Sequence, residues 1–117
     1  MGKKPDIVWE VQCWDNRKVI LHRQTLLDHV LRFHIESAFV VDELKRNFRQ
    51  PICVIDNRRN GTVNAIYEIQ CDGHPWLLVA IKFHGFVKRA VRTPGFIKTF
   101  YGVSTIPNGP VIWGKKP

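Results

Sequence analysis

The pattern of apolar residues changes at Pro51, and this change constrains the fold of the chain more than any other sequence feature. Before Pro51, apolar residues recur at helical spacing in two segments, about 24–34 and about 38–49. Proline cannot continue a helix, so Pro51 closes the second segment. After Pro51 come short runs of β-prone residues separated by turn residues, at about 52–55, 62–71, 76–83 and 97–103.

These patterns predict an α+β fold. We expect one or two N-terminal strands, at 7–13 and 18–21, and two helices packed on a four-stranded antiparallel sheet. His22 or Thr25 would cap the first helix. A chain of 117 residues has room for one core, so residues 1–117 are predicted to form a single domain.

The charge of the chain is unevenly distributed. Lys and Arg total 18 against 10 Asp and Glu, yet Asp72 is the last acidic residue, and residues 73–117 contain seven bases. Uncompensated cations repel one another and attract polyanions, so this C-terminal part of the chain favours an anionic partner, above all RNA. The alternative is a cationic face that serves solubility alone.

Several classes of protein are not indicated by the sequence. The three cysteines lack CxxC spacing, which favours reduced, buried thiols over a zinc site, and phosphate-binding GxGxxG and GxxxxGK motifs are missing. We therefore expect no metal and no cofactor. The N-terminus lacks the apolar block of a signal peptide, and no run of ~18 apolar residues is present, so we expect a cytoplasmic protein that does not enter a membrane.

Two histidines of the first predicted helix are candidates for proton transfer. On a helical wheel His34 falls within the apolar face and His29 at its edge. Histidine suits acid–base work because its ordinary pKa is near ~6.5. A histidine on an apolar face is also a common core residue, and the i, i+5 spacing makes the pair a poor metal site.

The last predicted strand and two basic segments supply candidates for RNA binding. Alternation along 97–105 places Thr99 and Tyr101 on one face, where they could bind phosphate oxygens or stack on a base, although both are ordinary strand residues. The basic candidates lie in the strand, in the long segment 84–96 and at a hairpin tip: Lys98, Lys88, Arg89, Arg92, Arg58 and Arg59. Long loops in compact domains often carry function.

A family resemblance adds to these candidates. The segment 21–36, the junction 49–52, Tyr67, the run 77–82 and the run 98–101 resemble the phage-barnase-like nucleases. That family belongs to the group of small ribonuclease folds that includes barnase, EndoU, colicin D and RelE toxins. The likeness spans about residues 19–107.

The resemblance implies both a site and an activity. A helix histidine (His29 or His34), Lys82, and Thr99 or Tyr101 would line the RNA groove. The activity would be that of a metal-independent endoribonuclease used as a toxin, with tRNA among its candidate targets and an acidic antitoxin or immunity protein as its inhibitor.

The sequence therefore predicts RNA cleavage by attack of the 2′-hydroxyl, which leaves a cyclic phosphate. Two alternatives stay open: a noncatalytic basic nucleic-acid-binding domain, and a protein-interaction module for an acidic partner.

Overall fold

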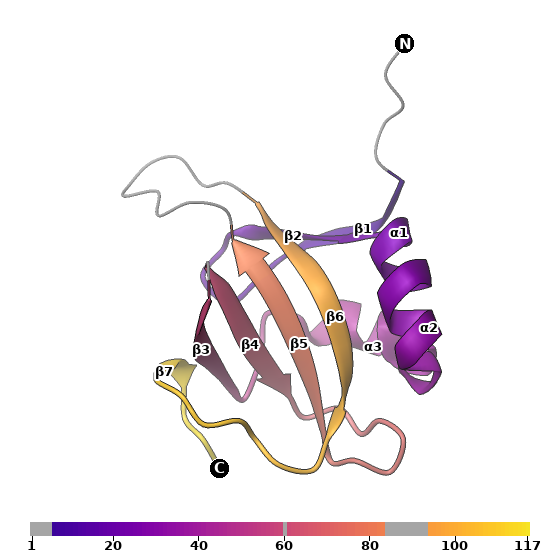
Figure 1. Ribbon diagram of the computed structural model, residues 1–117. Helices are drawn as coiled ribbons and strands as arrows, with labels where there is room; N and C mark the ends of the chain where they lie inside the picture. Colours follow the sequence, from indigo (N-terminus) through magenta and orange to yellow (C-terminus); the bar gives the residue numbers. More distant parts are fainter. Residues whose placement is uncertain (1–5, 60, 84–93) are drawn as a thin grey trace.

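Strands dominate the computed structural model of the chain, which describes residues 6–59, 61–83 and 94–117 (Figure 1). The strands are β1 (Ile7–Gln12), β2 (Lys18–His22), β3 (Cys53–Arg59), β4 (Thr62–Tyr67), β5 (Trp76–Phe83), β6 (Gly95–Val103) and β7 (Val111–Gly114). They form one sheet in the order β1-β2-β6-β5-β4-β3-β7. Neighbouring strands are antiparallel except β2 and β6, which are parallel.

The expected four-stranded antiparallel sheet under two helices was wrong. The described residues form a mixed sheet of seven strands with two short helical segments, and they are mostly sheet. Strands β3 to β6 are antiparallel neighbours, but β2 adds to β6 through Val19 opposite Gly95 and Ile20 opposite Phe96, and β7 adds to β3. Both additions pair backbone groups that the edges of a four-stranded sheet would leave open.

Two helical segments connect β2 to β3. The first consists of α1 (Arg23–Thr25), a π-helical stretch η1 (Leu26–Val30) and α2 (Leu31–Phe33), and the second of a 3₁₀ helix η2 (Ile35–Val40) and α3 (Val41–Asn47). His22 directly precedes α1, yet neither His22 nor Thr25 makes a capping hydrogen bond with its side chain. His22 therefore occupies the predicted cap position without a capping hydrogen bond, whereas Thr25 lies inside the helical segment.

The main core lies between the helical segments and one face of the sheet. Its largest fully buried members include Leu21, Leu44, Phe48, Tyr67 and Phe100. Burial of a side chain of this size contributes about 1.5–3 kcal/mol. This face of the sheet therefore supplies most of the hydrophobic stabilisation.

A smaller apolar cluster lies on the opposite face of the sheet. It is made of Cys53, Ile55, Ile66 and Leu78, with partly buried neighbours Trp76, Ala80, Tyr101, Val103 and Ile106. Ile106 follows β6 in the chain, so the segment beyond β6 covers part of this face. The first helical segment runs beside β6 (Figure 1). Two histidines, one at each end of that helical segment, are thereby brought close to β6.

Candidate functional site

Three opposed residue pairs on β5 and β6 define the face that carries the candidate site. The pairs are Lys82–Phe96, Ala80–Thr99 and Leu78–Tyr101. Residues directly opposed in an antiparallel pair project to the same face of the sheet. Leu78 and Tyr101 contact the smaller cluster, whereas Phe100 belongs to the main core. The face that holds Lys82, Phe96, Thr99 and Tyr101, which we call the β5–β6 face, is therefore turned away from the main core.

A β-bulge interrupts the alternation of β6 at Lys98. Ala80 is opposite Thr99 and Ile81 is opposite Ile97, which leaves Lys98 as the additional residue. Its side chain is exposed. A bulge bends its strand and changes the direction of side chains, so simple alternation, which would place Lys98 with Phe100, does not apply there.

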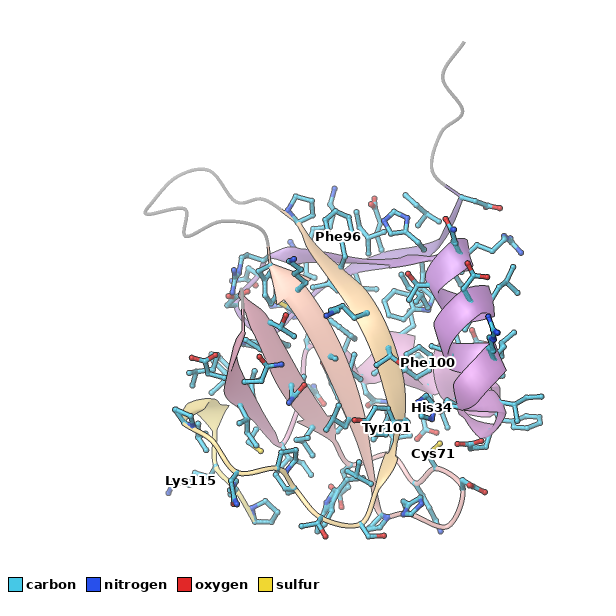
Figure 2. All side chains as sticks on the ribbon, viewed as in Figure 1. His34, Cys71, Phe96, Phe100, Tyr101 and Lys115 are labelled. Carbon is cyan, nitrogen blue, oxygen red and sulfur yellow. The ribbon has the colours of Figure 1, made fainter. Side chains whose placement is uncertain are left out.

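His34 lies beside Tyr101 at one end of this face. It follows the last residue of α2, where its backbone leaves the helix (φ −142°, ψ 57°), while its N–H still donates to the Val30 carbonyl at 2.6 Å. Its own carbonyl accepts from the Ser37 N–H at 2.9 Å. The His34 and Tyr101 rings are stacked, with centroids 4.6 Å apart and planes at 24° (Figure 2). Both side chains are half-buried, so His34 is held in place and still reaches the surface.

His22 occupies a matching position at the other end of the face, and the sequence-based site did not include it. Val19 and Leu21 in β2 are fully buried in the main core. Alternation therefore places the half-buried His22 on the opposite face, where its ring stacks on Phe96 at 5.3 Å and 20°. The alternation of residues 18–22 indicates that His22 is on the face opposite Val19 and Leu21. Only the parallel pairing of β2 with β6 shows that this face also holds Phe96.

Positive charge on these strands is not offset by acids in the same strands. Lys82 is half-buried, Lys98 is exposed, and neither β5 nor β6 contains Asp or Glu. Cations of the N-terminal part lie against carboxylates instead, in the pairs Arg17–Asp15 (2.7 Å), Lys18–Glu10 (3.7 Å) and Arg23–Asp6 (2.7 Å). The β5–β6 face is therefore suited to anions.

The other predicted site residues are less fully described. The backbone of His29 lies in η1, and the backbones of Arg58 and Arg59 lie in β3, but their side chains are outside the described set. Lys88, Arg89 and Arg92 also lie outside the described residues. The structure therefore brings together His34 and Tyr101, and it places Thr99 and Lys82 on the same face as Tyr101.

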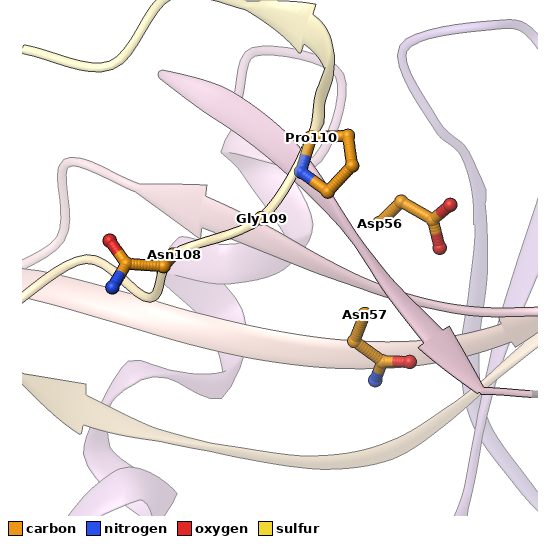
Figure 3. A pocket seen from close by; sticks show the side chains of 5 residues that line it. All are labelled: Asp56, Asn57, Asn108, Gly109 and Pro110. Atoms are coloured by element: carbon orange, nitrogen blue, oxygen red, sulfur yellow. The ribbon is translucent and has the colours of Figure 1, made fainter.

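Two shallow hollows elsewhere on the surface have unsuitable chemistry for phosphate. One lies where the chain beyond β6 approaches β3 and is lined by Asp56, Asn57, Asn108, Gly109 and Pro110 (Figure 3). The other is lined by Glu68, Gln70, Gly73 and Pro75. Each lining contains a carboxylate, and neither includes a cation among the described residues.

The cysteines are not activated nucleophiles. Burial, with a hydrogen bond to Asp15, raises the pKa of the Cys13 thiol to about 12. Burial also raises the pKa of Cys53 and of Cys71. A thiol reacts as its thiolate, so all three are inert near neutral pH. We therefore place no covalent step on sulfur.

The described residues contain neither a metal-binding cluster nor a helix that could cross a membrane. In residues 6–59, 61–83 and 94–117, no group of three or more His, Cys, Asp or Glu side chains is arranged to hold a metal ion. No helix in the same residues is long and apolar enough to cross a membrane.

No protein-family model matches the chain, and no curated protein and no solved structure matches it either. The resemblance to phage-barnase-like nucleases therefore stays a prediction. Because one fold can host many activities, function has to be argued from the chemistry of the site. That chemistry consists of His34 stacked on Tyr101, together with a lysine and a threonine on an acid-free pair of strands.

Proposed function

We propose that the protein is a metal-independent endoribonuclease whose β5–β6 face binds and cuts RNA. The observation that carries this proposal is the His34–Tyr101 stack, which holds an imidazole at the edge of a face that also presents Lys82 and Thr99. Stacking on Tyr101 limits rotation of the His34 ring, and a fixed ring is what a proton-transfer group needs.

The proposed reaction requires two proton transfers. The 2′-oxygen loses its proton and bonds to phosphorus, and the bond from phosphorus to the 5′-oxygen breaks as that oxygen gains a proton. The products are a 2′,3′-cyclic phosphate and a 5′-hydroxyl. Neutral His34 accepts the first proton. The leaving 5′-oxygen lies on the opposite side of phosphorus in an in-line displacement, so solvent water supplies the second proton.

Lys82 and Thr99 are proposed to hold the phosphate. Thr99 is opposite Ala80, and Lys82 is two residues further along β5 on the same face. Diagonal neighbours in a sheet are about 7–8 Å apart, within reach of a long side chain, so the Lys82 ammonium and the Thr99 hydroxyl can contact one phosphate. The small Ala80 side chain between them leaves room for it. A fixed cation beside phosphorus stabilises the charge that gathers in the transition state.

The family resemblance supports two further predictions about biological role. It implies that the enzyme acts as a toxin and that an acidic antitoxin or immunity protein inhibits it. The basic β5–β6 face is compatible with an acidic inhibitor. RNA and the acidic surface of such a partner are both negatively charged, so both would be attracted to the same positive charges.

The proposal is tested by incubating total RNA and purified tRNA with the protein in EDTA. The matched variants are His34→Gln, which keeps a polar side chain but cannot transfer a proton at neutral pH, and His74→Gln. His74 hydrogen-bonds Ser104 at 2.6 Å outside the proposed site. We expect cleavage by the wild type and by His74→Gln, and cleavage at least ~100-fold slower by His34→Gln.

Two results would contradict the proposal, the first its catalysis and the second the role of His34. Intact RNA at high concentrations of folded wild-type protein would leave a noncatalytic binder, if the RNA is retained on the protein, or a protein-interaction module, if it is not. Equal cleavage by His34→Gln and the wild type would remove His34 from the mechanism. Circular dichroism of each variant verifies that it is folded.

A further inference from the structure

A second stacked ring pair lies on the β5–β6 face, and the proposed reaction does not use it. His22 and Phe96 have nearly parallel rings, at 20°, and both side chains are half-buried. A pair sealed in the core would be fully covered, as Phe48 and Tyr67 are. The His22–Phe96 pair therefore combines a rigid geometry with an accessible surface.

The two stacked pairs are separated along one strand. Phe96 and Tyr101 are both in β6, with Thr99 and the Lys98 bulge between them. Five residues of extended strand span at most about 17 Å, and the bulge shortens this distance. One nucleotide cannot reach both stacks, whereas a short extended strand of RNA can.

We propose that the His22–Phe96 pair is a stacking site for an unpaired nucleobase, so that the substrate is single-stranded RNA lying along β6. This inference rests on the proposed function and deepens it. Histidine and phenylalanine rings are common stacking partners of splayed-out bases in RNA complexes, and a base can present its face to a ring only when it is free of a duplex. Lys82 is opposite Phe96, so the lysine proposed to hold the reacting phosphate also borders the stacking site.

The site predicts a dependence on substrate length. An RNA dinucleotide bound at His34 ends before it reaches His22, so it gains nothing from the second stack. A longer strand gains one base–ring contact, which appears as a lower KM with little change in kcat, because the contact is remote from the reacting phosphorus.

The test uses His22→Leu, which keeps apolar bulk but has no ring, and His22→Phe, which keeps the ring. His74→Leu is the matched control. For an RNA of about eight nucleotides, we expect His22→Leu to raise KM roughly 5- to 100-fold, the range for loss of one stacked base, with kcat within about threefold. His22→Phe should retain most of the wild-type KM, and no variant should change cleavage of a dinucleotide.

A binding measurement separates failure of this inference from failure of the proposed function. A 2′-O-methyl oligonucleotide of the same length cannot be cut, and its fluorescence anisotropy reports affinity alone. Weaker binding by His22→Leu supports the stacking site even if no RNA is ever cleaved. Equal affinity of His22→Leu and wild type overturns it, as does equally effective competition by duplex RNA, whether or not the wild type cleaves.

Discussion

The chain has two tyrosines, and they lie on opposite faces of the same sheet. Tyr67 in β4 is 1% exposed; its ring stacks on Phe48 at 5.5 Å, and its hydroxyl donates a 2.7 Å hydrogen bond to the Phe48 carbonyl. Tyr101 in β6 is half-buried and stacks on His34 instead. Tyr67 therefore anchors the second helical segment, whereas Tyr101 holds the His34 ring at the surface.

Burial in the main core also affects the ionisation of Tyr67. Burial raises the pKa of its hydroxyl well above the ordinary value for tyrosine, so Tyr67 is a permanent hydrogen-bond donor inside the main core. We therefore expect the main core to supply stability and the β5–β6 face to supply the proposed chemistry. Variants on the two faces should therefore affect different measurements.

The largest effect is expected from Lys82→Met, which removes the ammonium but keeps most of the carbon stem. Loss of one fixed donor to a transition-state oxyanion lowers rates by about 10²–10³. Lys115→Met removes the same charge beside β7, at the opposite edge of the sheet from β1, and should leave the rate unchanged. Single-turnover RNA cleavage measures both. An equal loss of rate in the two variants would mean that Lys82 acts only through the net charge of the protein and not through contact with the phosphate.

Tyr67→Phe tests the other side of the comparison. It leaves the Phe48 carbonyl without its hydroxyl donor, and an unsatisfied buried group costs about 1–3 kcal/mol in the free energy of unfolding. Tyr101→Phe keeps its ring and should change that free energy by less than about 0.5 kcal/mol. Urea unfolding measures both. A larger loss of unfolding free energy from Tyr101→Phe than from Tyr67→Phe would contradict the expectation that the main core, and not the β5–β6 face, supplies the stability.

The last effect is absent near neutral pH and comes from Cys13 in the main core. The pKa of this thiol rises from 9.0 to about 12 on folding. Below pH 9 it is protonated in both states, so its contribution is fully present. Between these two pKa values the unfolded state loses the proton first, and the free energy of unfolding falls by about 1.4 kcal/mol per pH unit. Urea unfolding of Cys13→Ala should show a shallower decline above pH 9 than the wild type, and identical slopes would contradict this assignment.

Local patterns predicted much of the fold. Alternation and turn residues located β3 to β6, and the Asp72–Gly73 turn adopts positive φ at both positions, as a tight turn requires. The size of the sheet was not predictable in this way, because β2 joins β6 across some seventy residues of chain and β7 is a run of four residues. Alternation marks each strand but does not identify the strand it pairs with, so such non-local pairing cannot be predicted from it.

The site was predictable only where local patterns determine the position of a residue. Alternation placed Thr99 and Tyr101 on one face, but the helical wheel could not place His34, because the preceding helix contains a π-helical stretch and ends before His34. His22 was interpreted as a helix cap because its position just before α1 is a cap position. Its stacking on Phe96 arises from the parallel strand pairing, which sequence reasoning did not find.

The chemical identity of the cleaved ends tests the central claim most directly. A single-stranded RNA is incubated with the protein in EDTA, and the 3′ end of the upstream fragment is identified by mass spectrometry. The account predicts a 2′,3′-cyclic phosphate and a 5′-hydroxyl from the wild type, and no product from a matched 2′-O-methyl RNA, because the attacking hydroxyl is blocked. A 3′-hydroxyl with a 5′-phosphate, or cleavage of the 2′-O-methyl RNA, would contradict it.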